Sequence, residues 1–238
     1  MIEKSRGIIL NSIKYGDSSK IVTVFTREFG KLAFIAKGAR TAKSKFGASL
    51  ELLTISEFTF YNKINSDLLI LSNSDIIKSS AKISKDSNQL LIGLMIAEVI
   101  NNSQEKRNIN SDLYDFAQQI ILELYNMNES PFHLFNKFMY GLSTLMGFAL
   151  YLDNFGEHSG EIAINLENGN LISENTLGKN NFKFRNEEIS YFYSLVKDEN
   201  YTDFILDKKS INHFYDFWVQ YFSFHLERKF VLKSAVFL

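Results

Sequence analysis

The sequence predicts an α+β protein, with a small β-barrel of the OB type followed by an α-helical domain that carries an irregular insertion. Two observations predict this fold class. Before residue 85, short runs of β-branched and aromatic residues are separated by turn residues; after it, apolar residues recur with a period of 3.6. We therefore expect a first domain over residues 1–82 and a second over 83–238, with the insertion at about 152–183.

The N-terminal part contains five predicted strands. In the fourth, Phe58 and Phe60 alternate with Thr59 and Tyr61, which is the period-two pattern of a half-buried strand. Five short strands in about 75 residues fit a small closed barrel of the OB type, and an SH3-like barrel or a small open sheet would give the same pattern. The predicted strands cover residues 7–14, 20–26, 31–37, 50–61 and 67–71.

After residue 85, five segments have the period of helices. Ser111 is the expected N-cap of the second, and Ser130-Pro131, an N-cap followed by proline, opens the third. Between the third and fourth lies the insertion, rich in Gly and Asn, with a short strand-like stretch at 162–166. The predicted helices cover residues 87–101, 111–127, 131–150, 186–197 and 210–229.

The composition excludes several classes of protein. Of the 238 residues, 45% are hydrophobic and 22% are charged, which is typical of a globular protein. The chain has no cysteine, which excludes disulfides, thiolate zinc sites and iron–sulfur clusters. No apolar run reaches the roughly 18 residues of a membrane span, and the N-terminus lacks the pattern of a signal peptide. We therefore expect a cytoplasmic protein.

The charge is divided unevenly along the chain. The formal net charge is −1, but residues 1–85 hold 14 Lys and Arg against 7 Asp and Glu, a net charge of +7. The remainder holds 12 against 20, a net charge of −8. Codon bias alone should spread lysine evenly. The asymmetry therefore favours a polyanionic partner for the N-terminal part.

One segment of that basic part resembles a nucleic-acid-binding loop. From Phe29 to Leu50 the chain has five basic residues and no acidic one, and Gly38 and Gly47 give the backbone freedom. Cations along the phosphates and rings for base stacking are what binders of single strands need. Tyr15, Phe46 and Tyr61 are the candidate stacking residues. A solvated loop without a ligand is the alternative. The five basic residues are Lys31, Lys37, Arg40, Lys43 and Lys45.

The sequence lacks the signatures of the common enzyme classes. It has no GxxxxGK[ST] loop, no GxGxxG, no GxSxG and no HExxH. We expect His133 and His213, on aromatic-rich helical faces, to be core or boundary residues. His158 could bind a metal only together with neighbouring carboxylates, and a solvated loop is the simpler interpretation. We therefore expect no enzymatic activity, no metal and no other cofactor.

Two stretches of the chain together carry a resemblance to a known family. Residues 7–61 contain a Tyr15-Gly16-Asp17 turn, a T.E.GKL…AKGAR..KS stretch from Thr26 to Ser44, and then a leucine-rich strand. The C-terminal stretch YFSFHLERKFVLKSAVFL has an aromatic-His-Leu-Glu pattern. In this order and spacing, these features resemble RecO, the family of bacterial recombination mediators.

The resemblance implies an OB-fold followed by a helical domain, and non-catalytic binding of single- and double-stranded DNA in the nucleoid. It also implies strand annealing, contact with the C-terminal tail of the single-strand binding protein SSB, and cooperation with RecR in loading RecA, with no role for a membrane. Carried over to this sequence, the DNA-contacting residues are Lys37, Arg40, Lys43 and Lys45, with Lys14 and Lys31 as weaker candidates.

The sequence departs from the resemblance at the insertion. Many members of the family carry a four-cysteine zinc module there, whereas this chain has Asp153, Asn154 and His158 where thiolates would be expected. We therefore expect a zinc-less branch. Its insertion would be anchored by apolar packing of Phe155, Ile162, Ile164 and Leu166.

The SSB contact is harder to place by sequence. The second domain is acidic overall, which opposes an acidic peptide tail at long range. Arg228, Lys229 and Lys233 form one local basic cluster near aromatic residues and are the candidates for partner binding. Cations that stabilise the C-terminal end of a helix are the simpler interpretation of the same residues.

Two other functions compete with a DNA-repair mediator. One is a generic OB-fold binder of single-stranded nucleic acid, with the helical domain serving only as a protein interface. The other is a nuclease or ligase fragment, for which the sequence shows no carboxylate cluster. A passive binder should not accelerate the annealing of SSB-coated strands, whereas a mediator should.

Overall fold

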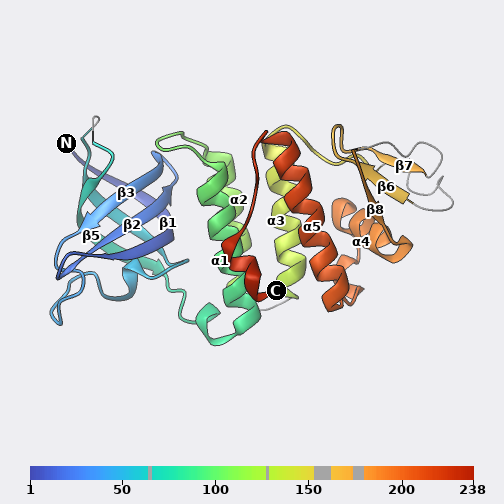
Figure 1. The fold of residues 1–238 in the computed structure, drawn as a ribbon. Coiled ribbons are helices and arrows are strands. Elements are labelled where there is room, and N and C mark those ends of the chain that lie inside the picture. Colours follow the sequence, from blue (N-terminus) through green and yellow to red (C-terminus); the bar gives the residue numbers. More distant parts are fainter. Residues whose placement is uncertain (64–65, 127–128, 153–161, 174–179) are drawn as a thin grey trace. The chain divides into compact units, whose positions relative to one another are not determined.

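The alternating apolar residues of the N-terminal part close five strands into a barrel (Figure 1). The strand order is β1-β2-β3-β5-β4; β3 and β5 pair in parallel and the other neighbours are antiparallel. This order is that of an OB-type barrel, which confirms the predicted fold class. The strands are β1 (Ile2–Tyr15), β2 (Ser19–Thr26), β3 (Gly30–Ala36), β4 (Ile55–Tyr61) and β5 (Leu69–Lys78).

The structure is a computed structural model that describes residues 1–63, 66–126, 129–152, 162–173 and 180–238. It divides into two compact units, Met1–Asn128 and Glu129–Leu238. The first unit therefore contains two helices in addition to the barrel. No helix within the described ranges is both long enough and apolar enough to cross a membrane.

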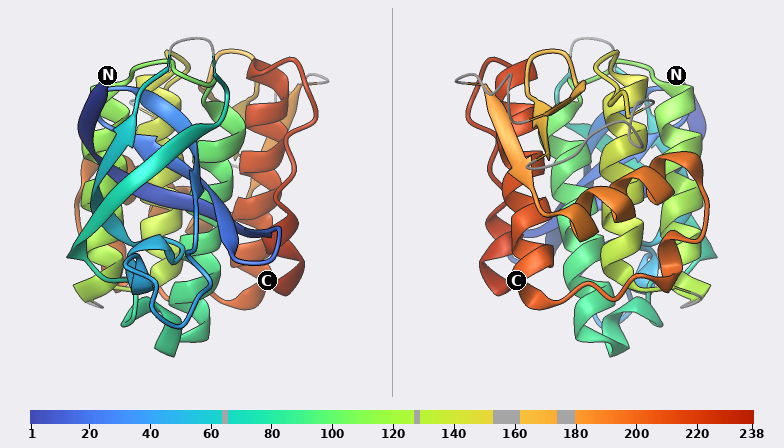
Figure 2. Two further views of the ribbon diagram at one scale, coloured as in Figure 1. Left: turned by 90° about the vertical axis from the view of Figure 1, so that its left-hand side faces the viewer. Right: turned by 90° about the vertical axis from the view of Figure 1, so that its right-hand side faces the viewer.

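The barrel core consists of the inward-facing side chains of the five strands. Phe34, Phe58 and Phe60 are fully buried, and the rings of Phe34 and Phe60 lie 4.9 Å apart between centroids. The strands wind obliquely around this core (Figure 2, left). Because successive side chains of a strand point to opposite faces, the apolar alternation along each strand determines which residues turn inward.

The fourth strand begins later than the sequence predicts. Residues Gly47–Leu50 form a short 3-10 helix, η1, and β4 starts at Ile55. Leu53 adopts a left-handed conformation (φ 64°), which interrupts an extended strand. Its carbonyl accepts a hydrogen bond of 2.5 Å from the hydroxyl of Tyr125. The leucine-rich segment therefore connects the barrel to the helices instead of extending the sheet.

Two helices, α1 (Ser87–Ser103) and α2 (Ser111–Asn126), complete the first unit; α1 follows a second 3-10 turn, η2 (Ile83–Lys85). The side chain of Asp86 caps α1. Asn110, not Ser111 as predicted, caps α2 by accepting from the amide of Leu113. Arg27 binds Asp115 through two hydrogen bonds of 2.8 and 2.9 Å, which tie α2 to the barrel.

The described residues of the second unit form helices and one small sheet. The helices are α3 (Pro131–Leu145), α4 (Asn186–Lys197) and α5 (Lys208–His225); the strands β6 (Ile162–Asn165), β7 (Leu171–Ser173) and β8 (Asn181–Phe184) form an antiparallel sheet in the order β7-β6-β8. Ile162, Ile164 and Leu166 are buried, as predicted for anchors of the insertion; Phe155 lies outside the described residues.

Two of these helices end before the predicted residue. Helix α3 ends in a Schellman motif, in which Gly147 (φ 88°) donates to the carbonyl of Thr144 and Phe148 to that of Ser143. This motif stops the helix before residue 150. Helix α5 begins after the N-cap Asp207 and ends at His225, because Glu227 is left-handed (φ 51°).

A polar network lies inside the second unit. Asn136 of α3 is buried; its carbonyl oxygen accepts from the indole N–H of Trp218 at 2.9 Å, and its amide donates to the hydroxyl of Tyr191 at 3.2 Å. Nδ1 of His133 lies 3.2 Å from the same hydroxyl. Burial lowers the pKa of His133, so the ring is a neutral core residue, as the sequence predicts.

Candidate nucleic-acid interface

The basic loop, residues 37–45, follows the last residue of β3 and is built from consecutive turns. Gly38 is left-handed (φ 71°) and its carbonyl accepts from the amide of Thr41. The carbonyl of Thr41 in turn accepts from the amide of Ser44. The loop then returns to the barrel at Phe46, whose side chain is only 4% exposed. The loop is therefore anchored at both ends by the barrel core.

Arg40 joins the basic loop to the turn between β1 and β2. Its amide donates to the carbonyl of Ser18 at 2.8 Å, and its guanidinium donates to the carbonyl of Gly16 at 3.0 Å. A guanidinium has five N–H donors, so Arg40 keeps donors for a further ligand. This contact brings Lys14 and Tyr15, at the end of β1, to the same end of the barrel as the loop.

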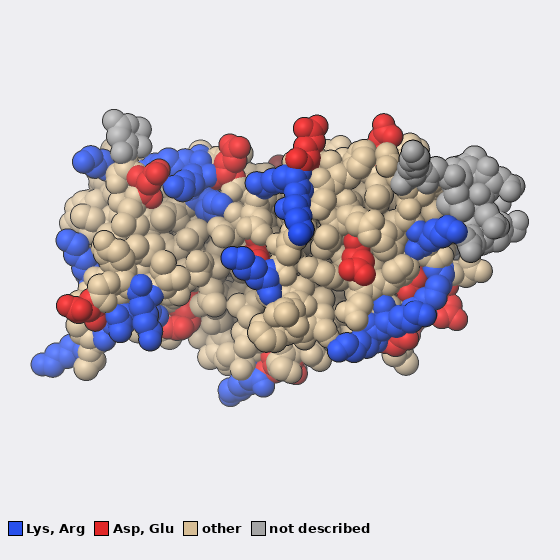
Figure 3. All heavy atoms as spheres, in the orientation of Figure 1, with Lys and Arg blue, Asp and Glu red and all other residues tan. Residues whose placement is uncertain are grey.

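Basic side chains outnumber acidic ones at this end. We call it the basic end; its acidic residues are Asp17, in the turn, and Glu51, which pairs with Lys20 at 3.0 Å. Figure 3 shows blue side chains at the lower edge of the barrel, where Figure 1 shows the loop after β3. With six cations against two carboxylates the local net charge is +4, and such a surface attracts polyanions. The six cations are Lys14, Lys20, Lys37, Arg40, Lys43 and Lys45.

The exposure of these side chains suits contact with a ligand. Lys14, Lys37, Arg40, Lys43 and Lys45 are all exposed. Tyr15, a candidate stacking residue, is 51% exposed beside them. The ammonium of Lys45 lies 5.4 Å from the centroid of the Phe46 ring, which holds that lysine against the barrel.

The structure corrects the prediction for Phe46. Its side chain belongs to the barrel core, where it is packed with Phe34, Phe58 and other apolar residues. A nucleic-acid base cannot stack on a ring that is covered on both faces. Phe46 stands among charged residues in the sequence because the loop rejoins the barrel core at this residue. It does not offer a stacking surface.

The structure also separates Lys31 from the other basic residues. Lys31 lies at the start of β3, and its ammonium donates to the carbonyl of Asn101, in the last turn of α1, at 2.5 Å. A cation at the C-terminal end of a helix stabilises the helix dipole. Lys31 therefore holds α1 on the barrel, about 20 Å of strand away from Lys37.

Lys20 belongs to the basic end although the sequence did not single it out. It is directly opposite Lys14 in the β1–β2 ladder and opposite Ala36 in the β2–β3 ladder. Cross-strand partners lie side by side on one face. The signal therefore lies in the register of the hairpin, which places Lys20 beside Lys14.

The second predicted cluster lies beyond the end of α5. Arg228 and Lys229 are exposed and follow the last helical residue, His225, while Lys233 opens a short 3-10 helix, η6 (Lys233–Phe237). Val236 and Phe237 of η6 are 79% and 77% exposed. The assignment of these three cations to a partner site stays a prediction.

A buried carboxylate organises the polar part of the second unit. Glu188 is 3% exposed; Oε1 accepts from the guanidinium of Arg185 at 2.5 Å and Oε2 from the Arg185 amide at 3.0 Å. Oε2 also lies 2.8 Å from Nδ1 of His213. Burial raises the pKa of Glu188, but these hydrogen bonds outweigh burial and hold the pKa below its usual value.

This lowered pKa predicts a stability that depends on pH. Because Glu188 is more acidic in the folded than in the unfolded state, its stabilisation is present above the unfolded pKa and is lost as the pH falls through the folded pKa. We expect Glu188→Gln to lower the free energy of unfolding by about 2 kcal/mol at pH 7, and by progressively less below about pH 4.5. The neighbouring Glu187→Gln is the control, because Glu187 is exposed. Urea unfolding across pH measures both; equal pH profiles for the two variants would contradict the assignment.

A zinc module does not fit this chain. The module that the resemblance implies needs four thiolates, and the chain has no cysteine. Asp153, Asn154 and His158 lie outside the described residues. Within the described part of the chain, no group of three or more His, Asp and Glu side chains is arranged to hold a metal ion.

Comparison with known proteins matches nearly the whole chain to one family. The family model described as "Recombination protein O N terminal" matches residues 1–80, and "Recombination protein O C terminal" matches residues 84–233. The chain is 30% identical to the "DNA repair protein RecO" of Mesoplasma florum over 224 residues, which are 88% of this chain and 79% of that protein.

Other relatives of the same name match over shorter stretches. The chain is 31% identical to the protein of Chlorobium phaeobacteroides over 62% of its own length and 57% of the relative's. The chain is 38% identical to the protein of Salinibacter ruber, over 44% of its own length and 40% of the relative's. In these two relatives the similarity therefore spans about half of the protein.

Proposed function

The chain belongs to the recombination protein O family, and from this premise we propose that it binds DNA through the basic end of its barrel and acts in recombinational DNA repair. The observation that carries the proposal is the joining of the basic loop to the β1–β2 turn by Arg40. That contact joins the cations of the loop after β3 to the turn that follows Lys14 and the exposed Tyr15.

The chemistry of this end suits a single strand of DNA. Lysine and arginine neutralise phosphates and release their counterions, and an exposed aromatic ring stacks with any base. Lys37, Arg40 and Lys43 would contact the backbone, while Tyr15 would stack with a base. These contacts do not read the sequence, so they also allow the duplex to be bound through its phosphates.

Binding of this kind supports annealing without a chemical step. Neutralising phosphates lowers the repulsion between two complementary strands and leaves their base edges free to pair. We therefore propose that the protein anneals complementary strands. We propose no catalytic reaction and no cofactor.

The partners of a mediator belong to the same proposal. They are RecR, the C-terminal tail of SSB and, indirectly, RecA, and the setting is the nucleoid in the cytoplasm. The support for them is family membership together with the relatives' name, "DNA repair protein RecO". Arg228, Lys229 and Lys233 remain the proposed contacts for the acidic tail.

An annealing assay tests the proposal against a passive binder. Two complementary labelled oligonucleotides are coated with SSB, and their pairing is followed by energy transfer with and without the protein. A mediator accelerates pairing, and Lys37→Ala/Arg40→Ala/Lys43→Ala abolishes the acceleration. Tight binding to the bare strands without any acceleration would favour a generic OB-fold binder.

A further inference from the structure

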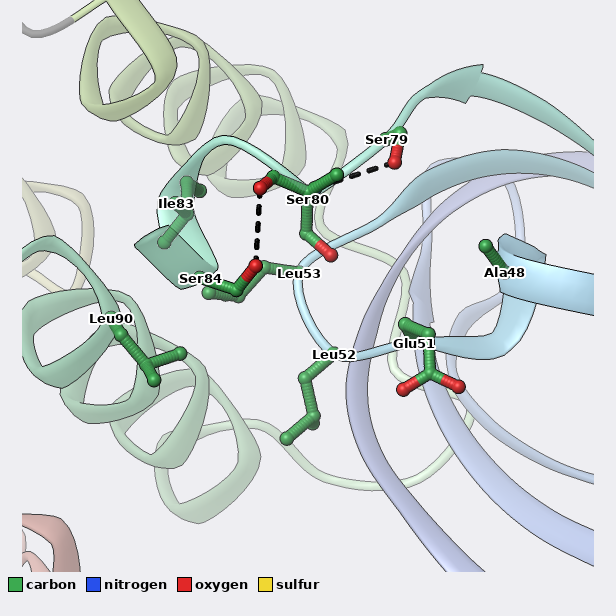
Figure 4. A pocket seen from close by; sticks show the side chains of 10 residues that line it. Ala48, Glu51, Leu52, Leu53, Ser79, Ser80, Ile83, Ser84 and Leu90 are labelled. Carbon is green, nitrogen blue, oxygen red and sulfur yellow. Dashed lines mark hydrogen bonds between the residues drawn. The ribbon is translucent and has the colours of Figure 1, made fainter. Parts of the chain in front are cut away.

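A cavity of ≈ 340 Å³ opens in the first unit between η1, η2 and α1. Its walls are mainly apolar, with Leu90 of α1 on one side and Leu52, from the segment after η1, on another (Figure 4). Polar groups from Glu51 and from three serines, Ser79, Ser80 and Ser84, lie at its edges. A cavity of this size and character is typical of a site for a small organic group.

Contacts connect this cavity to the basic loop. Arg40 donates to the carbonyls of the β1–β2 turn, at Gly16 and Ser18. Two residues beyond Ser18, Lys20 pairs with Glu51 at the edge of the cavity. On the other side, the chain runs from the basic loop through Phe46 directly into η1, whose Ala48 lines the cavity. A strand held by the basic loop is therefore next to the cavity.

The charge at the edge decides which part of a nucleotide can enter. Glu51 is 57% exposed at its side chain and is paired with Lys20, so this edge of the cavity carries no net positive charge that would hold a phosphate. The apolar walls favour an uncharged group. A base is uncharged and fits these walls, whereas the charged sugar–phosphate backbone does not.

The pair of Lys20 and Glu51 presents a distinct hydrogen-bonding pattern. The ammonium is a donor, and the carboxylate supplies two acceptor oxygens, of which only Oε1 is used by Lys20. In a base pair, cytosine presents the same pattern to guanine: one donor, its 4-amino group, followed by two acceptors, N3 and O2. Guanine has O6 for the ammonium, and N1–H and the 2-amino group for the carboxylate.

We propose that this cavity binds one guanine base of a single strand whose phosphates lie on the basic loop. The inference rests on the proposed function, because the loop must first hold the strand. Charge-assisted hydrogen bonds to the Watson–Crick edge supply the preference, and Leu52 and Leu90 pack against the base.

A set of oligonucleotides tests the base preference. Fluorescence anisotropy measures the binding of oligothymidylate and of the same strand with a single central guanosine or inosine. We expect the guanosine strand to bind more tightly than oligothymidylate by about tenfold. Inosine lacks the 2-amino group and should fall between the two.

Variants separate the cavity from the basic loop. Glu51→Ala and Ala81→Trp, which places a ring in the cavity, should both remove the guanosine preference while the salt dependence persists. Glu57→Ala is the control, because Glu57 forms a comparable exposed pair with Lys4. Melting temperatures show that each variant is folded.

The outcomes distinguish this inference from the function on which it rests. Steep salt dependence with equal affinity for all three strands would overturn the guanine site and leave DNA binding intact. The guanine site is overturned as well if Ala81→Trp keeps the preference, because the preference then arises outside the cavity. If none of the strands binds at low salt, DNA binding itself is contradicted.

Discussion

Gly30→Ala is expected to lower the free energy of unfolding of the first unit by about 3 kcal/mol. Gly30 has a φ of 65°, a conformation that costs an L-residue about 1–2 kcal/mol. A Cβ atom there would also lie 2.1 Å from the carbonyl oxygen of Asn108. This neighbour is backbone and cannot rotate away, so the α1–α2 connection would have to move.

That connection protects the edge of the barrel. Only Phe34 and Ile35 of β3 pair with β5, and the start of β3 is covered instead by the connection, where the amide of Arg107 donates to the carbonyl of Lys31 at 3.0 Å. An uncovered strand edge invites pairing with other chains. We therefore also expect Gly30→Ala to aggregate more readily than the wild type.

Gly16→Ala is the matched control for this variant. Gly16 has a similar φ of 54°, but among the described residues no atom outside Gly16 and its two chain neighbours lies within 4 Å of the position of its Cβ. Its cost should be the backbone term alone, about 1 kcal/mol. Urea denaturation of both variants measures the loss of unfolding free energy in each. Equal losses would show that the backbone at Asn108 moves away from the added Cβ atom at no cost.

Asn136→Leu is expected to destabilise the second unit by about 3 kcal/mol. The substitution leaves the indole N–H of Trp218 without its acceptor, in a place where that residue is 1% exposed. It also removes one partner of the Tyr191 hydroxyl, a group whose burial raises its pKa strongly. Buried polar groups without a partner lose their hydration with no compensation.

A double-mutant cycle checks this explanation. Trp218→Phe removes the indole N–H that Asn136 satisfies, so Asn136→Leu should cost clearly less in that background than in the wild type. Thermal or urea unfolding of the four proteins supplies the interaction energy. Strictly additive costs would mean that the hydrogen bond between the two side chains contributes nothing.

The sequence predicts the strands and helices that have a clear apolar period. It underestimates β5, because the polar run Ser72–Asp75 in the second half of that strand hides the alternation. It also misses β7 and β8, which are three and four residues long and too short to show a period. These strands form through pairing with β6, a tertiary interaction that no local pattern contains.

The candidate site likewise has features that a local sequence pattern predicts and features that only tertiary contacts determine. The basic loop and the turn are recognisable from composition, because clustered lysines without acidic neighbours are a local signal. The roles of Phe46 and Lys31 depend on which way each side chain points once the barrel has closed. Phe46 fills the barrel core and Lys31 donates a hydrogen bond to α1, and both contacts join residues of different elements. Sequence periodicity cannot supply that information.

Binding of a labelled single-stranded oligonucleotide across a salt series tests the central claim most directly. The variants are Lys37→Ala/Arg40→Ala/Lys43→Ala and a control of equal charge change, Lys4→Ala/Lys63→Ala/Lys106→Ala, whose lysines are exposed elsewhere on the first unit. We predict that the wild type and the control bind with the same steep slope, and that the loop variant binds weakly with a slope shallower by about two. If the loop variant binds like the wild type, or if the control loses as much affinity, the basic end of the barrel is not the DNA site.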